Sequence, residues 1–252
     1  MNRKSLLLVI SIAAISQAAS AVPFTFKAGE AASAQQVNDN FKSLEDRLTV
    51  YDYRNFSRAD TITEKTFSTT TSAGINCFPV EVRQYKNTPA GENTEIVVTR
   101  IRKDALDKVC QYHEFNYLNT PTERRLLNEV TKSSDGVDVT GTMSYDSYMV
   151  VATASMIKGM TFGSGSTLTF DPAITGQSVH MTNYVALGLD DVKVPANSYT
   201  GCLKMSVAEA GAMRISWFCA GVGEVKRIRK AINVTSGTAS YVSRTWVLES
   251  YK

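Results

Sequence analysis

The plainest chemistry in this sequence belongs to its four cysteines, Cys77, Cys110, Cys202 and Cys219. No two of them form a Cys-x-x-Cys motif, the arrangement typical of redox-active pairs. An even number of cysteines indicates disulfide bonds in an oxidising compartment, where such bonds persist. Three pairings are possible, and buried free thiols are the alternative.

Turn chemistry favours one of these pairings. Two predicted strands flank residues 210–211, where glycine accepts the positive φ that a tight turn requires. With that turn, Cys202 and Cys219 face each other at a non-hydrogen-bonded position of the hairpin, where Cα atoms approach to about 4.5 Å. This separation suits a disulfide. Cys77 and Cys110 then form the second bridge by elimination.

The remaining titratable residues form no recognisable catalytic set. His113 and His180 lie on predicted strands far apart in the sequence, and no G-x-S-x-G motif accompanies them. A glycosidase needs two carboxylates about 5 to 9 Å apart. Candidates for such a pair are Glu92, Glu95, Glu123 and Glu129. We predict a non-enzymatic protein without catalytic residues, metal or cofactor, and a secreted hydrolase is the third alternative.

The elements that would position these residues are mostly strands. From about residue 59, apolar side chains alternate with polar ones, and glycine-rich or proline-containing turns separate the runs. The predicted strands are 61–70, 75–85, 94–103, 109–118, 123–132, 137–153, 157–170, 178–187, 198–208, 213–220, 222–233 and 240–251. Because so many strands cannot stay flat, we expect a mainly β fold, a curled antiparallel sheet or half-barrel.

One amphipathic helix precedes the strands. Ser33 and Gln36 form a capping-box pattern that marks its start. An apolar stripe with heptad spacing follows, too short to require a coiled coil. The stripe could dock on the protein's own sheet or drive homo-oligomerisation. Its residues are Val37, Phe41, Leu44, Leu48 and Tyr51.

The first 21 residues resemble an export signal. Arg3 and Lys4 precede a short apolar run over residues 6–15, and residues 19–21 read Ala-Ser-Ala, the small-x-small pattern of a cleavage site. The expected organisation is a signal peptide over 1–21, an N-terminal helical segment over 22–58 and an antiparallel β domain over 59–252. The expected location is periplasmic or extracellular, with no transmembrane segment in the mature chain.

The charge balance disfavours a nucleic-acid partner. The chain has 27 Lys and Arg against 24 Asp and Glu, for a net charge of +3. Removal of the two basic residues of the leader leaves about +1, too little for long-range attraction to phosphates.

The densest basic cluster has two faces. Strand alternation sends Lys226 and Lys230 to one side and Arg227 and Arg229 to the other. We interpret it as a solvated edge strand that resists aggregation. Contact with an anionic glycan or a lipid headgroup is the alternative.

A C-terminal signature resembles that of bacterial periplasmic and surface proteins. In those proteins a valine-proline-alanine-glycine turn opens a strand, and an aromatic strand ends in glycine-valine-glycine-x-valine-lysine. The resemblance implies an antiparallel half-barrel like that of lipoprotein carriers. The residues that carry it here include Pro195, Asn197, Gly221, Val222, Gly223 and Lys226, with Asn197 and Glu224 departing from the usual pattern.

A second resemblance lies near the N-terminus of the mature chain. The pattern F-x-x-G-x-x-x-x-A-x-x-V-N-x-N-F-x-x-L is similar to a segment that follows the signal peptide in many exported bacterial proteins. It implies a surface or assembly context. The matching residues are Phe26, Gly29, Ala34, Val37, Asn38, Asn40, Phe41 and Leu44.

Together these features predict an exported binding protein. The expected ligand is apolar or derived from the envelope, or a protein partner, held against a curved sheet with an apolar concave face. The alternative is a surface or fibre protein that self-associates through its N-terminal helix.

Overall fold

The computed structural model describes residues 24–25, 31, 33–48, 50–53, 56, 61–72, 77–171, 178–209, 211–235 and 238–252. The side chains of residues 43–48, 77–78, 178–180, 232–235 and 238–241 lie outside this description, as does the predicted signal peptide. The chain divides into two compact units, Met1–Asp46 and Arg47–Lys252.

The helix α1 (Ala34–Leu48) begins where the sequence predicts. The Gln36 N–H donates to Ser33 Oγ at 3.1 Å, and the Ser33 N–H donates to Gln36 Oε1 at 3.0 Å. This reciprocal pair is a capping box, which satisfies two backbone donors at the helix start. One turn later, the Asn40 amide accepts from the Phe24 N–H at 3.0 Å and donates to the Phe24 carbonyl at 2.8 Å. Among the described residues, no helix is long and apolar enough to span a membrane.

The predicted apolar stripe is only partly helical. Val37 is half-buried and Phe41 is 66% exposed on α1. The side chains of Leu44 and Leu48 lie outside the description. The inclusion of Tyr51 is wrong, because the helix ends at Leu48 and Tyr51 belongs to β1 (Val50–Tyr51) in the second unit.

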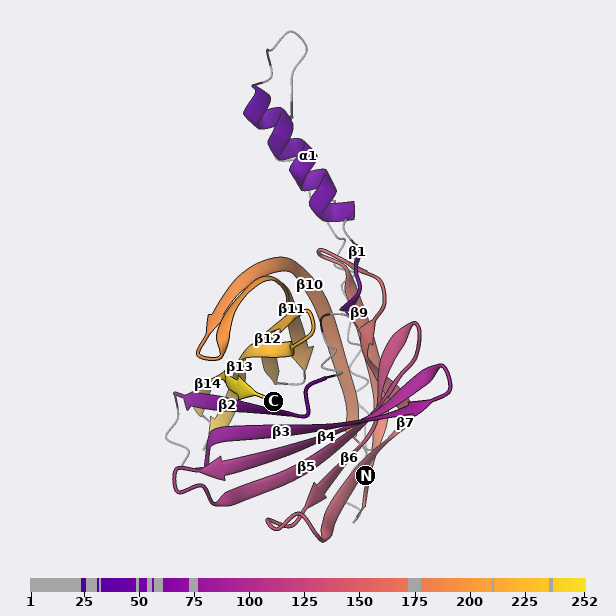
Figure 1. Cartoon of the computed structure of the whole chain (residues 1–252), viewed down its shortest axis with the longest axis vertical. Coiled ribbons are helices and arrows are strands. Elements are labelled where there is room, and N and C mark those ends of the chain that lie inside the picture. Colours follow the sequence, from indigo (N-terminus) through magenta and orange to yellow (C-terminus); the bar gives the residue numbers. More distant parts are fainter. Residues whose placement is uncertain are drawn as a thin grey trace, which may run out of the picture. The chain divides into compact units, whose positions relative to one another are not determined.

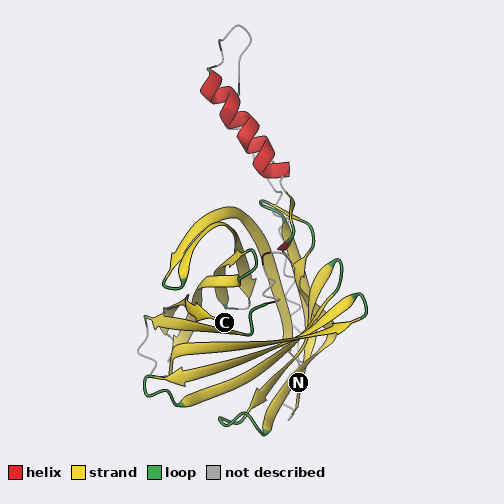
Figure 2. Ribbon diagram, viewed as in Figure 1, coloured by secondary structure: helices red, strands yellow, loops and turns green. Residues whose placement is uncertain are grey.

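The second unit is a closed antiparallel barrel of twelve strands (Figures 1 and 2). Their order around the ring is β10-β11-β12-β13-β14-β2-β3-β4-β5-β6-β7-β9, and β9 pairs with β10. The strands are β2 (Glu64–Thr71), β3 (Cys77–Ala90), β4 (Asn93–Asp104), β5 (Val109–Asn119), β6 (Glu123–Lys132), β7 (Val139–Thr153), β9 (Thr161–Asp171), β10 (Ser178–Val194), β11 (Asn197–Glu209), β12 (Ala212–Cys219), β13 (Gly223–Thr235) and β14 (Thr238–Tyr251).

Ring closure corrects the expected curled sheet or half-barrel. Twelve predicted runs correspond to these strands, so the strand content is confirmed. The difference is that β14 pairs with β2 and β9 pairs with β10, which leaves no gap in the ring. Every strand of the described ring therefore has two neighbours, so neither end of the twelve-strand order is an unpaired edge.

The hairpin of β11 and β12 has the predicted register. Glu209 pairs with Ala212 around the turn, and Leu203 pairs with Phe218 further along. In this register, the residues that follow that pair, Cys202 and Cys219, come close together, as a disulfide between them requires.

The Cys202–Cys219 disulfide is confirmed, with a Cα–Cα distance of 4.3 Å. Cys110 on β5 is also disulfide-bonded. The side chain of Cys77 lies outside the description, so its bridge to Cys110 stays a prediction.

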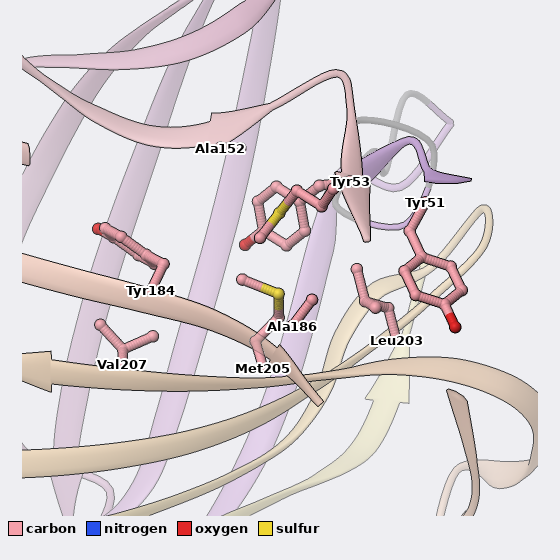
Figure 3. Packing of buried hydrophobic residues seen from close by; sticks show 9 residues of the cluster. Tyr51, Tyr53, Ala152, Tyr184, Ala186, Leu203, Met205 and Val207 are labelled. Atoms are coloured by element: carbon pink, nitrogen blue, oxygen red, sulfur yellow. The ribbon is translucent and has the colours of Figure 1, made fainter. Parts of the chain in front are cut away.

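A short segment after α1 fills part of the barrel interior. β1 pairs with β8 (Met156–Ile157), and Tyr51 and Tyr53 are 5% and 7% exposed. They belong to a buried cluster with side chains from β7, β8, β10 and β11 (Figure 3). The residues of the cluster are Tyr51, Tyr53, Ala152, Met156, Tyr184, Ala186, Leu203, Met205 and Val207. These tyrosines precede residue 59, where the sequence suggested the β domain would begin.

The residues of the C-terminal signature form turns. Pro195 lies between β10 and β11, and Asn197 begins β11. The N–H of the intervening Ala196 donates to the carbonyl of Leu248 at 3.1 Å, which fastens this turn to β14. The signature therefore includes one of the long-range contacts of the barrel.

The second half of the signature is the turn between β12 and β13. Gly221 and Gly223 have φ values of +73° and +77°, which side chains other than glycine rarely adopt. Between them, the Val222 N–H donates to the Cys219 carbonyl at 3.1 Å. Lys226 lies beyond this turn, with Nζ 5.0 Å from the centroid of the Trp217 ring.

Candidate functional site

The barrel encloses a cavity of about 240 Å³ with a charged lining. Five of its lining residues are basic and three are acidic. In addition to these, apolar side chains from β4, β7 and β11 line the wall. The charged residues are Lys65, Arg83, Arg124, Arg214, Arg227, Glu129, Glu209 and Glu224. Positive charge therefore exceeds negative charge in the described wall.

A chain of ion pairs runs along one side of this cavity. The fully buried Glu81 accepts from Arg83 Nε at 2.7 Å and from Arg102 Nε at 3.0 Å. Arg83 also contacts Glu224 through Nη1 at 2.5 Å. Arg227 donates from Nε and Nη2 to the two oxygens of Glu224 at 2.9 and 2.5 Å. Each carboxylate thus binds two guanidinium groups, which offsets the cost of removing it from water.

The electrostatics of this chain favour its charged form. Burial alone would raise the pKa of Glu81 and of Glu224. The surrounding guanidinium groups, Arg83 for Glu81 and Arg227 for Glu224, instead hold the pKa of each carboxyl well below its usual range. Both carboxylates therefore stay ionised at neutral pH.

Aromatic rings support the guanidinium groups. Arg83 lies 4.3 Å from the centroid of Phe67 on β2, and Arg227 lies 5.4 Å from the centroid of Trp246 on β14. These two strands separate β3 from β13 in the ring. The ion pairs thus connect β3 with β13 across the rings of Phe67 and Trp246. Cation–π attraction holds the guanidinium groups against these rings.

Lys65 is buried without a carboxylate among its described contacts. Its Nζ lies 3.4 Å from the Glu224 carbonyl oxygen and 5.2 Å from the centroid of the Tyr85 ring. Its side chain is 1% exposed. Burial, with Arg83 nearby, lowers the pKa of the Lys65 ammonium to about 7. An anion bound in the cavity would favour the protonated form.

Tyrosine rings make up much of the rest of the cavity wall. The Tyr145 hydroxyl donates to Glu129 Oε1 at 2.7 Å. The ring of Tyr184 stacks on Phe162 with centroids 4.6 Å apart, and burial raises the pKa of Tyr85 to about 12. These groups stay neutral and present flat faces and hydroxyl donors to the cavity. The tyrosines of the lining are Tyr53, Tyr85, Tyr117, Tyr145 and Tyr184.

A second pocket, of about 400 Å³, adjoins the first at Glu129, which lines both. Strand ends of β5, β6, β7 and β9 form it. Met143 and Phe170 give it an apolar surface, and His113 and Thr131 contribute polar groups. The barrel interior thus contains the charged cavity and, beside it, a less polar pocket.

His113 is neutral in this environment. Arg100 can only donate, so its Nη2, at 2.7 Å, requires His113 Nδ1 to accept. The proton then lies on Nε2, which donates to Thr131 Oγ1 at 2.6 Å. Burial, with Arg100 and Arg102 nearby, lowers the pKa of His113 to about 4. The other histidine, His180, has its side chain outside the description.

The structure separates the carboxylates considered for glycoside hydrolysis. Glu129 lines the cavity and accepts from Tyr145, whereas Glu92 and Glu95 are exposed. Glu123 pairs with Arg125 Nε at 2.5 Å. Of these four carboxylates, Glu129 alone lines the cavity.

The basic cluster on β13 has the predicted alternation but a different environment. The interpretation as an edge strand is wrong, because β13 pairs with both β12 and β14. Arg227 faces the interior beside Glu224, and Arg229 Nε lies 4.0 Å from Glu209. Lys230 on the other face is exposed.

Sequence reasoning missed the interior residues of the first half of the barrel. Glu81 and Arg83 alternate with Val80 and Val82 on β3, and the charged residues are the ones more deeply buried. A period of two was visible in the sequence. This period indicated that each strand has two faces. The apolar face was expected to form the core, whereas on β3 the charged face does so.

We predict that Glu224→Gln lowers the free energy of unfolding by about 3 kcal/mol, because two buried guanidinium groups lose their charged partner. Urea unfolding at pH 7 measures this. The matched control is Glu95→Gln, which removes an exposed carboxylate and should change stability by less than about 0.5 kcal/mol. Equal effects of the two variants would show that the ion pairs do not stabilise the barrel.

We also predict a pH dependence from His113. Its folded pKa lies below the ordinary value of 6.5, so its contribution to stability is complete above pH 6.5 and is lost as the pH falls towards 4. The partial exposure of the ring limits the loss to about 1 kcal/mol. Between pH 7 and 5, urea unfolding of His113→Gln should depend less on pH than that of the wild type.

The comparison variant is His180→Gln, which removes the other histidine and measures how much of the slope between pH 7 and 5 belongs to it. The stabilisation by the buried carboxylates is complete above their ordinary pKa of 4.5 and is lost only as the pH falls below it, which is outside this window. A wild-type slope in His113→Gln would assign the pH dependence to another group.

Comparison with known proteins gives no family for this chain. No family model matches it, and no curated protein matches its sequence. Its structure is similar to that of a presumed lipoprotein from Parabacteroides distasonis, with 10% identity, a TM-score of 0.49 and coverage of 78% of this chain and 98% of that one. It is also similar to a presumed exported protein with a YmcC-like fold from Bacteroides fragilis, with 14% identity, a TM-score of 0.47 and coverage of 75% and 94%. Both similarities concern the path of the chain alone.

Proposed function

We propose that this chain is an exported, non-enzymatic binding protein that holds a small polar molecule with an acidic group in its barrel cavity. The observation that carries this proposal is the cavity lining, in which five basic side chains outnumber three acidic ones. Charged groups buried in a water-poor cavity attract an opposite charge more strongly than the same groups do on a surface.

The lining favours a polar ligand over the apolar one expected from the sequence. Arginines, a lysine and tyrosine hydroxyls face the cavity. An apolar molecule would bury these groups without giving them partners, which is costly. An acid can accept hydrogen bonds from several of them, and tyrosine faces can pack against its carbon skeleton.

Export is supported by the sequence and by the disulfide. The N-terminal residues have the charge, length and cleavage pattern of a signal peptide. The Cys202–Cys219 bridge belongs to an oxidising compartment such as the periplasm or the cell exterior.

The proposal predicts that small acids bind and that filling the cavity abolishes binding. Val98 lines the cavity, and Val97 projects to the opposite side of the same strand. In calorimetric titrations, at least one of galacturonate, citrate and phosphate should bind saturably. Glucose and the apolar dye Nile red should not. Val98→Phe should weaken acid binding at least tenfold, whereas Val97→Phe should leave it unchanged.

Saturable uptake of Nile red without binding of any acid would contradict the proposal and favour an apolar ligand. Equal losses in Val98→Phe and Val97→Phe would place the binding site outside the cavity. Thermal unfolding of both variants checks that the larger side chain, which costs about 1 to 3 kcal/mol when it overpacks a core, leaves the barrel folded.

A second candidate function is self-association through α1, for a role at the surface or in a fibre. Phe41 is 66% exposed on this helix, which is unusual for a large aromatic side chain. Light scattering of the mature chain should then give an oligomer, and the double variant Val37→Ser, Phe41→Ser should give a monomer. Lys42→Ser is the control. An unchanged mass in the double variant excludes association through this stripe.

A further inference from the structure

Three arginines form a continuous row across neighbouring strands. Arg214 on β12 pairs directly with Arg229 on β13, and Arg229 pairs with Arg244 on β14. Directly opposed residues of antiparallel strands project to the same side of the sheet. Because Arg214 lines the cavity, the whole row faces the barrel interior. We call these three residues the arginine row.

This arrangement is unfavourable unless an anion is present. Like charges at directly opposed positions of two strands destabilise the sheet. Glu209 is the carboxylate that two members share, 3.3 Å from Arg214 Nη1 and 4.0 Å from Arg229 Nε. The Nε of Arg214 is buried without a hydrogen-bond partner among the described residues. Burial, with Arg229 nearby, lowers the pKa of Arg244.

The arginine row differs from the structural ion pairs of the same barrel. Arg83 and Arg227 are almost buried, and each meets a carboxylate at 2.5 Å. Arg229 is 39% exposed and stands 4.0 Å from the carboxylate it approaches. Arg229, at the centre of the row, therefore has donors that are accessible and loosely held, which suits a site that binds a ligand.

We propose that the arginine row binds a linear oligoanion whose acidic groups are spaced about 5 Å apart. Neighbouring strands lie about 4.8 Å apart, so the three arginines at paired positions project from backbone positions that repeat at this interval. Each can hold one acid group through two parallel hydrogen bonds. This inference rests on the proposed function and extends it, since Arg214 would join an acid in the cavity to further acids along the row.

The test compares oligomeric with monomeric acids at matched charge concentration and ionic strength. The probes are trigalacturonate, tripolyphosphate and galacturonate, titrated by calorimetry into the full mature chain. Trigalacturonate, with its carboxylates on successive sugar rings, should bind ten or more times more tightly than galacturonate. Tripolyphosphate tests the spacing, because its neighbouring phosphates share an oxygen and lie closer together, and tighter binding of tripolyphosphate than of trigalacturonate would overturn the proposed spacing. Equal binding of monomer and oligomers would overturn the proposal.

Variants locate the effect on the row. Arg229→Gln and Arg244→Gln should each weaken oligoanion binding about tenfold, the loss expected for one charge-assisted contact, and change galacturonate binding less than twofold. Lys230→Gln removes the same charge from the exposed face of β13 and should have no effect. If Lys230→Gln weakens oligoanion binding as much as Arg229→Gln does, net charge alone explains the attraction and the proposal is overturned.

Stability without ligand separates a binding role from a structural one. If repulsion in the row is uncompensated, Arg229→Gln should raise the melting temperature in low salt, and Lys230→Gln should not. A lower melting temperature in Arg229→Gln would show that the arginine row stabilises the fold, and it would overturn the proposal. If Val98→Phe weakens galacturonate binding while the row variants bind oligoanions normally, the row proposal fails and the cavity function stands. If no acid of any length binds the wild type, both fail.

Discussion

Closing twelve strands into a ring creates an interior too wide for aliphatic side chains alone to fill, and long charged side chains span much of it. Glu224 illustrates how this is achieved, because it accepts from Arg83 on a distant strand and from Arg227 on its own. A buried carboxylate is tolerated only with such partners. The guanidinium groups in turn lie over Phe67 and Trp246, so packing and charge pairing depend on each other.

The interior charges fall into two kinds. Around Glu81 and Glu224, every carboxylate oxygen has a guanidinium partner, and the groups are almost fully buried. Near the turn between β11 and β12, basic groups are in excess and partly exposed. The first arrangement holds strands together, and the second leaves hydrogen-bond donors available. A single barrel therefore combines tightly paired arginines with partly exposed ones.

Much of the fold could be predicted from local pattern. Period-two alternation located the strands, and glycine at 211 fixed the register that joins Cys202 to Cys219. Closure could not be predicted, because hydrogen bonds between β14 and β2 join segments with no local signal in common. The charged interior wall was missed for a related reason. Alternation on β3 shows that Val82 and Arg83 face opposite ways, but only closure determines which of them is inside.

The seam of the barrel lies between its first and last strands. The N–H groups of Thr63 and Glu64 donate to the carbonyl of Lys252, 189 residues further along from the first of them. A nascent chain emerges N-terminus first, so one edge of β2 stays unpaired until β14 is available. Such an edge recruits other strands readily. Folding of this chain should thus be slow, in keeping with its distant contacts, and should benefit from a chaperone that shields β2 until synthesis is complete.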